Sequence, residues 1–409
     1  MHQRAIRTRH AMTGLAAALA LGATALTAPA HAATGPDHGN DTTQAALERM
    51  VENGAPGVGA MSHRPDGTWF GQAGAADLDT GRERTAKDRF RAASITKTFI
   101  ATVLLQLEAE GKLSLDDTVE DWLPGVVQGN GNDGSKITLR QLLQHTSGLF
   151  NYTADPEMWE RFTTGFPQHR YDTYKPRELV SIALQHQPDF EPGKGWSYSN
   201  TGYVLAGMVI EEATGKPYAK AVKQRVIKPL KLKETSFPGT RVTLPRPHAV
   251  AYSKLWSEDP DAKIHDVTEL NPSWAGAAGE IVSTTGDLNR FFGALLRGEL
   301  LPRPQQSAMF NTVPVGDEFP GEYGLGIYSL KLSCDKTVWG HGGSLHGSLS
   351  NVLGTRNGDH VLTANMNGDW LRDEQAYSDL FEAEFCGKKP GPGGSGPALN
   401  GSARQSPLS

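Results

Sequence analysis

Hydrophobic and polar positions follow two kinds of pattern along the chain. Apolar residues at intervals of three and four predict helices, and short apolar runs bounded by glycine, proline or aspartate predict strands. The first part of the chain is predicted to contain a helix at 44–51, strands at 58–62 and 68–73, and a helix from Ser94 to near Gly111. This last helix is apolar enough to be a buried central helix.

The middle of the chain has a different pattern. From about residue 113 to residue 273, helical segments separated by proline and glycine replace the strand signals. The expected helices are 137–144, 178–185, 203–212 and 218–226. The pattern predicts an inserted helical domain at 114–273.

Strand patterns return after residue 273. The expected strands are 278–283, 323–330, 337–339 leading into His341, 348–353 and 360–365, and the expected helices are one capped by Asp287 and one at 372–385. The sheet therefore draws strands from both ends of the chain. The predicted fold class is α+β: an antiparallel sheet flanked by helices, built from residues 33–113 and 274–388.

The two ends of the chain are predicted to lie outside this fold. Residues 1–32 have the pattern of a secretory signal peptide, with three arginines, an Ala/Leu-rich run and the cleavage signature Ala30-His31-Ala32. No later stretch approaches the roughly 20 apolar residues that a spanning helix needs, so no membrane span is expected. Residues 389–409 are rich in glycine, proline and serine, which predicts a disordered tail. We expect a secreted, extracellular protein.

Charge and cysteine content narrow the function classes. Removal of residues 1–32 takes away three arginines and no acid, so the formal net charge falls from −5 to −8. A mildly acidic chain is a poor nucleic-acid binder. Histidine and cysteine show no zinc-binding spacing, so neither a metal nor a cofactor is expected.

An oxidising compartment favours one disulfide between Cys334 and Cys386 over two free thiols.

Ser94 and Lys97 form the first candidate chemical pair. On a helix, residues three apart lie on one face, so the Lys97 amine can reach the Ser94 hydroxyl. A lysine can take the proton of a serine once burial or nearby cations lower its pKa. The same spacing also fits an N-cap serine followed by a solvated lysine.

Tyr198-Ser199-Asn200 is the second candidate element, and it precedes a predicted helix. A phenol has a pKa of about 10, and a cation such as Lys97 within about 4–6 Å can lower it, so Tyr198 could act as a base. Asn200 could hold Lys97 and a substrate carbonyl. The tripeptide also fits an ordinary turn.

The third element is Trp339-Gly340-His341-Gly342-Gly343-Ser344. Its glycines would let a substrate backbone lie against a strand edge, and an N–H near Ser344 could form an oxyanion hole with that of Ser94. His341 could lend positive charge or a hydrogen bond. A tight turn with a surface histidine is the alternative. The His-Gly-Gly loop of lipases is excluded because no G-x-S-x-G elbow is present.

The ordered combination of Ser94-Ile95-Thr96-Lys97, Tyr198-Ser199-Asn200 and His341-Gly342-Gly343 resembles the three motifs of the penicillin-recognising serine hydrolases. It is most similar to the branch with class C β-lactamases and actinomycete D-alanyl-D-alanine carboxypeptidases. The resemblance runs from about Gln44 to Lys388, including His145-Thr146-Ser147-Gly148-Leu149 and Gly276-Ala277-Ala278-Gly279. The cysteine pair is also similar to that of the carboxypeptidases.

The resemblance implies a role for each of these residues. Ser94 would form an acyl-enzyme, while Lys97 and Tyr198 share the proton transfers and Asn200 positions Lys97 and the substrate. The N–H groups of Ser94 and Ser344 would hold the oxyanion. Trp274 and Trp159 are candidate pocket walls. The implied partner is a small peptide or a β-lactam, and we expect a monomer.

Two departures leave the substrate open. Tyr328 stands where the close carboxypeptidases offer an arginine to the substrate carboxylate, and Gly342 replaces a threonine. The first hypothesis is a D-alanyl-D-alanine carboxypeptidase or transpeptidase acting on peptidoglycan stem peptides. The second is a class C-like β-lactamase, the third is an esterase or D-amino-acid amidase, and the fourth is a non-enzymatic penicillin-binding sensor.

Overall fold

The structure is a computed structural model that describes residues 40–316 and 321–389. The predicted signal peptide at 1–32 and the predicted tail beyond residue 389 lie outside the described residues. Across 40–316 and 321–389, every helix is too short or too polar to cross a bilayer.

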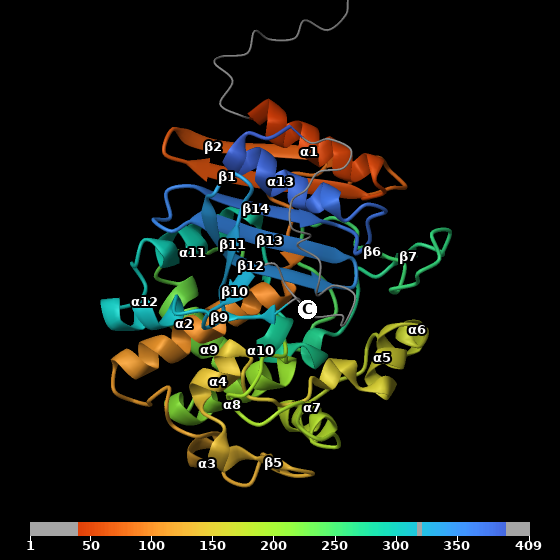
Figure 1. The fold of residues 1–409 in the computed structure, drawn as a ribbon. Coiled ribbons are helices and arrows are strands. Elements are labelled where there is room, and N and C mark those ends of the chain that lie inside the picture. Colours follow the sequence, from red (N-terminus) through yellow and green to blue (C-terminus); the bar gives the residue numbers. More distant parts are fainter. Residues whose placement is uncertain (1–39, 317–320, 390–409) are drawn as a thin grey trace, which may run out of the picture. The chain divides into compact units, whose positions relative to one another are not determined.

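An antiparallel sheet of eight strands, counted over the described part of the chain, forms the centre of the fold (Figure 1). Its strands run in the order β2 (Gly67–Gly74), β1 (Gly57–Arg64), β14 (Val361–Met366), β13 (Ser348–Thr355), β12 (Thr337–Leu345), β11 (Tyr328–Lys331), β10 (Gly321–Tyr323) and β9 (Val313–Pro314). The N-terminal hairpin pairs with the C-terminal strands through β1 and β14, where Val58 lies opposite Met366. The predicted α+β sheet built from both chain ends is therefore confirmed.

Helices cover both faces of the sheet. On one face, α1 (Asn40–Glu52) and α13 (Gln375–Cys386) lie side by side (Figure 1) and enclose an apolar cluster with the inward side chains of the strands. On the other face, α11 (Thr285–Leu296) packs against β1, β13 and β14. The helix α2 (Thr96–Ala109) is buried along most of its length within the second apolar cluster. Burial of this helix gives its first turn a dry environment.

Most of the remaining helices come from the middle of the chain. They are α3 (Val119–Trp122), α4 (Leu139–Gln144), α5 (Pro156–Phe162), α6 (Phe166–His169), α7 (Pro176–Ala183), α8 (Asn200–Thr214) and α9 (Tyr218–Val222), followed by α10 (Gly276–Gly279) and α12 (Arg303–Met309). Short strand pairs join β3 (Phe90–Arg91) to β8 (Val282–Ser283), β4 (Gln128–Gly129) to β5 (Asn132–Asp133), and β6 (Tyr252–Ser253) to β7 (His265–Asp266). The boundaries of the inserted domain at 114–273 stay a prediction.

Three predicted elements are wrong in detail. Residues 323–330 form the ends of two strands, β10 and β11, because the chain reverses where the N–H of Gly324 donates to the Ile327 carbonyl. Residues 278–283 are divided between the helical turn α10 and the short strand β8. Thr284, not Asp287, caps α11, since its hydroxyl accepts the N–H of Asp287.

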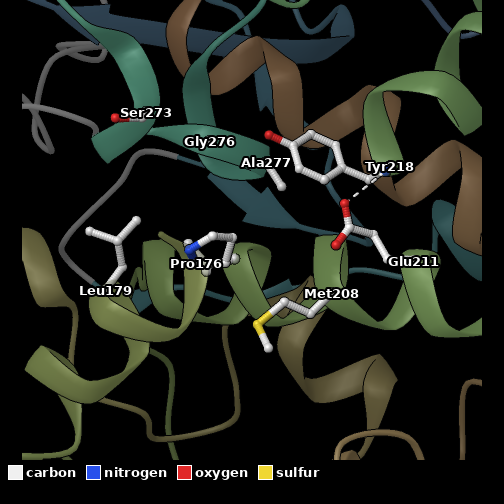
Figure 2. Close-up of a pocket in the computed structure, with 9 residues that line it drawn as sticks. Pro176, Leu179, Met208, Glu211, Tyr218, Ser273, Gly276 and Ala277 are labelled. Carbon is white, nitrogen blue, oxygen red and sulfur yellow. Dashed lines mark hydrogen bonds between the residues drawn. The ribbon is translucent and has the colours of Figure 1, made fainter. Parts of the chain in front are cut away.

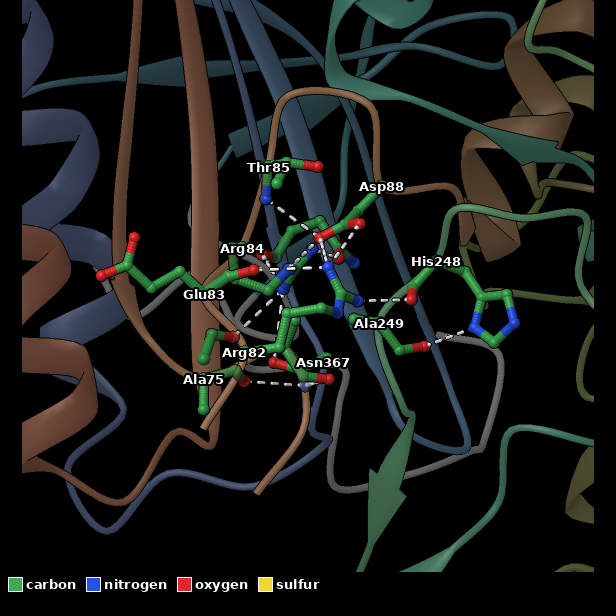
Figure 3. Close-up of polar contacts among 12 residues, drawn as sticks. Ala75, Arg82, Glu83, Arg84, Thr85, Asp88, His248, Ala249 and Asn367 are labelled. Atoms are coloured by element: carbon green, nitrogen blue, oxygen red, sulfur yellow. Dashed lines mark hydrogen bonds and ion pairs between the residues drawn. The ribbon is translucent and has the colours of Figure 1, made fainter. Parts of the chain in front are cut away.

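A buried ion pair attaches the loop before β3 to the sheet (Figure 3). Arg84 is 4% exposed, donates to the Asn365 side chain at 2.7 Å and lies 3.5 Å from Asp88. Asp88 also pairs with Arg82 at 3.1 Å. Because this loop leads directly to Phe90 and then to Ser94, the network fixes the approach to the predicted nucleophile.

A disulfide joins Cys334 to Cys386, with the Cα atoms 5.8 Å apart. Cys334 lies in the turn between β11 and β12, and Cys386 is the last residue of α13. The bond therefore ties the C-terminal helix to a hairpin turn rather than to a strand.

Candidate active site

Ser94 lies in a 3₁₀ turn, η1 (Ala93–Ile95), immediately before α2. The preceding residue, Ala93, has a φ of 48°, which is uncommon for a residue with a side chain. A Cβ at Gly343 of β12 would lie 2.2 Å from the Ala92 carbonyl and 3.0 Å from the Ser94 nitrogen. Glycine is therefore required at 343 by the turn that holds Ser94, and not only by an approaching substrate as the sequence predicts.

Lys97 is fully buried, and its amine makes three polar contacts. Nζ lies 2.8 Å from Ser94 Oγ, 2.7 Å from Asn200 Oδ1 and 2.9 Å from the Ala278 carbonyl. Burial lowers the pKa of Lys97 well below its usual value, which favours the neutral amine. A neutral amine has two hydrogens and one lone pair. The amide and carbonyl oxygens can only accept, so the lone pair is left to face the Ser94 hydroxyl.

Asn200 is the first residue of α8, and its amide orientation is set by its neighbours. Nδ2 donates to Asn151 Oδ1 and to Thr153 Oγ1, both at 3.2 Å, so Oδ1 must face Lys97. Neither Asn151 nor Thr153 was among the residues predicted from sequence. An isolated asparagine or threonine in a loop carries no signal that it will bind a distant amide.

Ala278 belongs to α10, which packs closely on α8. A Cβ at Gly207 of α8 would lie 2.5 Å from the Ala277 side chain, so the two helices could not approach as closely with any larger residue. Figure 2 shows Tyr218 beside Gly276 and Ala277, at a pocket whose lining includes residues of α7, α8 and α10. Neither Ser94 nor Lys97 lines that pocket. The close packing places the two oxygen acceptors of Lys97 on adjoining elements.

Tyr198 lies two residues before α8, with its ring against Lys97. The Nζ atom is 4.8 Å from the ring centroid. The hydroxyl is buried and makes no well-formed hydrogen bond, although it lies near enough to Ser94 for that hydroxyl to oppose the effect of burial on its pKa. Burial dominates and raises the pKa of Tyr198. The prediction that Lys97 lowers this pKa is therefore wrong for the free protein, because Lys97 is itself favoured as a neutral group.

His341 is a residue of β12 and is buried. Its Nδ1 lies 2.6 Å from the Gly342 carbonyl, which requires a proton there, so Nε2 accepts the hydroxyl of Tyr323 at 2.7 Å. Burial lowers the pKa of His341 to about 3. A positive charge, one of the two contributions predicted for His341, is absent at neutral pH. The alternative of a tight turn with a surface histidine is wrong, because the segment is part of β12 and His341 is buried.

One edge of β12 has no partner among the described strands beside the Ser94 turn. The pairing of β11 with β12 begins at Tyr328 opposite Gly340, whereas β13 pairs with β12 as far as Leu345. From His341 to Leu345, the described strands therefore pair with β12 on one side only. An extended substrate can add along such an edge, next to the N–H groups of Ser94 and Ser344.

The two predicted pocket walls, Trp274 and Trp159, contact other aromatic residues. Trp274 is buried, its carbonyl accepts the Tyr152 hydroxyl at 2.6 Å, and its ring is 4.3 Å from Phe162. Trp159 is half-buried, with its ring 6.4 Å from that of Trp256. Tyr328 is buried, and its hydroxyl donates to Asn351 at 2.9 Å. Over the described residues, no group of histidines, cysteines and carboxylates could hold a metal ion.

Comparison with known proteins identifies the fold family. The family model described as beta-lactamase matches residues 42–378. The chain belongs to this family. It is a serine hydrolase of the β-lactamase and penicillin-binding protein superfamily.

Solved structures resemble this β-lactamase family member over nearly all of their length. A D-stereospecific amidohydrolase from Streptomyces sp. is 53% identical, with a TM-score of 0.80, over 85% of this chain and 99% of that chain. The D-amino acid amidase from Ochrobactrum anthropi SV3, complexed with L-phenylalanine amide, is 31% identical, with a TM-score of 0.73, over 84% and 98% of the two chains.

Curated relatives match over a shorter region. Penicillin-binding protein 4* from Bacillus subtilis (strain 168) is 30% identical over 262 residues, which cover 62% of this chain and 55% of that protein. The chain spans about half the length of the curated relatives it matches.

Proposed function

We propose that this β-lactamase family member hydrolyses amides of D-amino acids through an acyl-enzyme on Ser94. The observation that carries the proposal is that Lys97 and His341, the two basic side chains predicted at this site, are both favoured as neutral groups. Lys97 is favoured as a neutral amine and is bound by Ser94, Asn200 and Ala278, and His341 is neutral at neutral pH. A substrate carboxylate would lose its water there without gaining a counter-charge, which costs free energy. An amide is neutral and needs no counter-charge. The 53% identity to a D-stereospecific amidohydrolase supports the D configuration.

In the proposed acylation, the neutral Lys97 takes the proton of Ser94 while Ser94 Oγ attacks the amide carbonyl. The N–H groups of Ser94 and Ser344 hold the developing oxyanion, and one such donor is typically worth about 3–4 kcal/mol in kcat. Tyr198, protonated because burial raises its pKa, gives its proton to the leaving amine. The C–N bond breaks, and the acyl group remains on Ser94.

In the proposed deacylation, a water takes the place of the leaving amine. After acylation Lys97 holds the proton of Ser94 and Tyr198 is deprotonated. Tyr198 therefore accepts a proton from the water as it attacks the ester carbonyl, and Lys97 returns its proton to Ser94 Oγ as the serine leaves. The titrations of Lys97 and Tyr198 are coupled, so the pH profile will report pKa values of the pair rather than of either residue.

A substrate panel tests this proposal. We expect kcat/KM to be highest for D-amino-acid amides, lower for their L isomers and lowest for peptides that end in D-Ala-D-Ala with a free carboxylate. Short acyl esters should also react, because their carbonyls need no counter-charge. Preference for the free D-Ala-D-Ala terminus over the D-amide would overturn the proposal.

The D-alanyl-D-alanine carboxypeptidase predicted from sequence is the second candidate. Two observations favour it: the edge of β12 without a partner among the described strands, along which an extended peptide could add, and the similarity to penicillin-binding protein 4*. It predicts that labelled penicillin acylates the protein and stays bound. Rapid turnover of penicillin would instead indicate a β-lactamase, and a Ser94 that reacts with no probe would indicate a binding protein.

The Ser94→Ala substitution tests the nucleophile itself. It removes only the hydroxyl that lies 2.8 Å from Lys97, so we expect loss of covalent labelling by a fluorophosphonate probe with an unchanged far-UV circular dichroism spectrum. The measurement is intact mass before and after treatment. Labelling at full stoichiometry in the variant would place the nucleophile elsewhere.

We also propose that the protein acts outside the cytoplasm as a monomer. The location is supported by the signal-peptide pattern of residues 1–32 and by the Cys334–Cys386 disulfide, since disulfides persist in oxidising compartments. Fractionation of expressing cells tests the location, and light scattering of the purified protein tests the oligomeric state. Retention of unprocessed protein in the cytoplasm, or a stable dimer, would contradict these two expectations.

A further inference from the structure

His145 holds the backbone on both sides of Tyr198. It is the C-cap of α4, in the left-handed conformation with a φ of 61°, and it is 1% exposed. Its carbonyl accepts the N–H of Ser197 at 3.1 Å, and its Nδ1 accepts the N–H of Ser199, also at 3.1 Å. One residue from a distant helix therefore binds both neighbours of Tyr198.

The imidazole of His145 also packs against the phenol. Its ring centroid lies 4.2 Å from that of Tyr198, with an interplanar angle of 34°, and 4.7 Å from that of Tyr323. On the Tyr198 ring, the amine of Lys97 is 4.8 Å from the centroid. The direction of the phenol is thus constrained by its backbone and by both groups that contact its ring.

The protonation of His145 argues against a role in proton transfer. Nδ1 accepts a hydrogen bond, so the single proton of the neutral ring is on Nε2, a buried atom with no hydrogen-bond partner. Burial lowers the pKa of His145 well below its usual value. A ring that stays neutral and whose proton has no acceptor cannot relay protons, but it can hold a neighbour in place.

We propose that His145 is a positioning residue for Tyr198, acting through the Nδ1 bond to Ser199 and the carbonyl bond to Ser197. This inference rests on the proposed role of Tyr198 as proton donor to the leaving group. A displacement of about 1 Å in such a group can cost about 10²-fold in rate. Loss of the Nδ1 acceptor should therefore lower kcat far more than it changes KM.

Two matched substitutions test the proposal. H145G removes the side chain but tolerates the left-handed backbone, while H145N also tolerates it and places an oxygen where Nδ1 accepts the Ser199 N–H. We expect kcat to fall about 100-fold in H145G, with KM within about threefold of wild type, and we expect H145N to recover kcat to within about tenfold of wild type. An H145N variant as impaired as H145G, or an H145G variant with kcat within about threefold of wild type, would overturn the proposal.

A double-mutant cycle separates positioning from general stability. In a Tyr198→Phe background, the H145G substitution should cost less than about threefold in kcat, because the group it positions is already absent. An undiminished cost would show that His145 acts elsewhere. If circular dichroism shows that H145G does not fold, H145Q replaces it, since glutamine fills the space without placing an acceptor at Nδ1. The outcomes stated for H145G then apply to H145Q.

Kinetics on both a D-amino-acid amide and a p-nitrophenyl ester keep the two proposals distinguishable. Wild-type activity on the ester alone would contradict the proposed amide hydrolysis, while the His145 series could still be measured on the ester. Normal amide hydrolysis with an unaffected His145 series would contradict only the positioning proposal.

Discussion

Two buried basic side chains, Lys97 and Arg84, differ in whether a carboxylate lies beside them. Arg84 is 4% exposed and lies beside Asp88, and although burial lowers the pKa of its guanidinium to about 10, it remains charged at neutral pH. Lys97 is fully buried, and its contacts with Ser94, Asn200 and Ala278 are all to neutral groups, so its pKa falls well below the usual value. A buried base that is accompanied by a carboxylate keeps its proton and serves the fold. Lys97, with no carboxylate among its described contacts, is instead favoured as the neutral amine that can act as a base.

Two buried carboxyl groups, Glu384 and Glu280, show the same dependence on their partners. For these acids, burial raises the pKa and cationic partners lower it. Burial alone would raise the pKa of Glu384, but hydrogen bonds from His360, Ser62 and Arg64 together lower it to about 2. Glu280 accepts only the hydroxyl of Tyr218 and the N–H of Gly239, with no cation among its described partners, and burial raises its pKa. In both pairs, burial favours the neutral form of the side chain, and a partner of opposite charge favours the charged form.

Replacing Lys97 by a permanent cation should have the largest effect. Lys97→Arg cannot supply a lone pair, so kcat should fall by about 10³-fold, within the range of a lost general base. It also buries a charge without a carboxylate and should lower the free energy of unfolding by about 3–5 kcal/mol. Lys97→Met, the control, should lose the activity but little of the stability. An arginine variant as stable as the methionine variant would contradict the comparison.

Removal of Arg84 should mainly affect stability. Arg84→Met leaves the buried Asp88 carboxylate with Arg82 as its remaining cation, which predicts a loss of about 3 kcal/mol in urea unfolding. Arg82→Met is the control, because its half-exposed guanidinium pairs with the same carboxylate and should contribute less than about 1 kcal/mol. Equal losses of unfolding free energy in the two variants would show that the buried Arg84 contributes no more to stability than the half-exposed Arg82.

Acid should weaken the fold through Glu384. Its folded-state pKa, about 2, lies below the usual value of 4.5, so its contribution is complete above about pH 4.5 and is lost as the pH falls towards 2. The shift corresponds to about 3 kcal/mol. Chemical unfolding at successive pH values measures the loss, which Glu384→Gln should largely remove between pH 4.5 and 2. A variant with the wild-type acid dependence would assign that dependence to other groups.

Glu280 should give the smallest effect, with the opposite sign. Because its folded-state pKa is raised, its contribution is complete below the unfolded pKa and declines as the pH rises through the folded value. Glu280→Gln should remove this decline, so the variant should gain stability relative to wild type as the pH rises from 4 to 8. Tyr218→Phe, which loses the hydrogen bond from the Tyr218 hydroxyl to Glu280, should cost about 1 kcal/mol at low pH. A Glu280→Gln variant that becomes less stable than wild type as the pH rises would contradict the assigned direction.

Much of the fold could be predicted because local patterns carry it. The hairpin at 57–74, the central helix after Ser94 and the final strands have clear periods and turn residues, and the structure contains all of them. Prediction failed where two local solutions compete. Thr284 and Asp287 are both good N-caps, and only the packed start of α11 selects the threonine. The 323–330 segment reads as one strand because its turn is short and apolar.

The candidate site also has features that the local sequence predicts and features that only the tertiary structure determines. The spacing of Ser94 and Lys97 within one helical turn is a property of the local sequence, and so are the motifs that contain Tyr198, Asn200 and His341. Their protonation is not, because it depends on desolvation and on partners 103 and 181 residues from Lys97 along the chain. The sequence therefore names the groups that can exchange a proton with Ser94. Tertiary packing, by removing water and supplying only neutral acceptors, decides which of those groups holds the proton at rest.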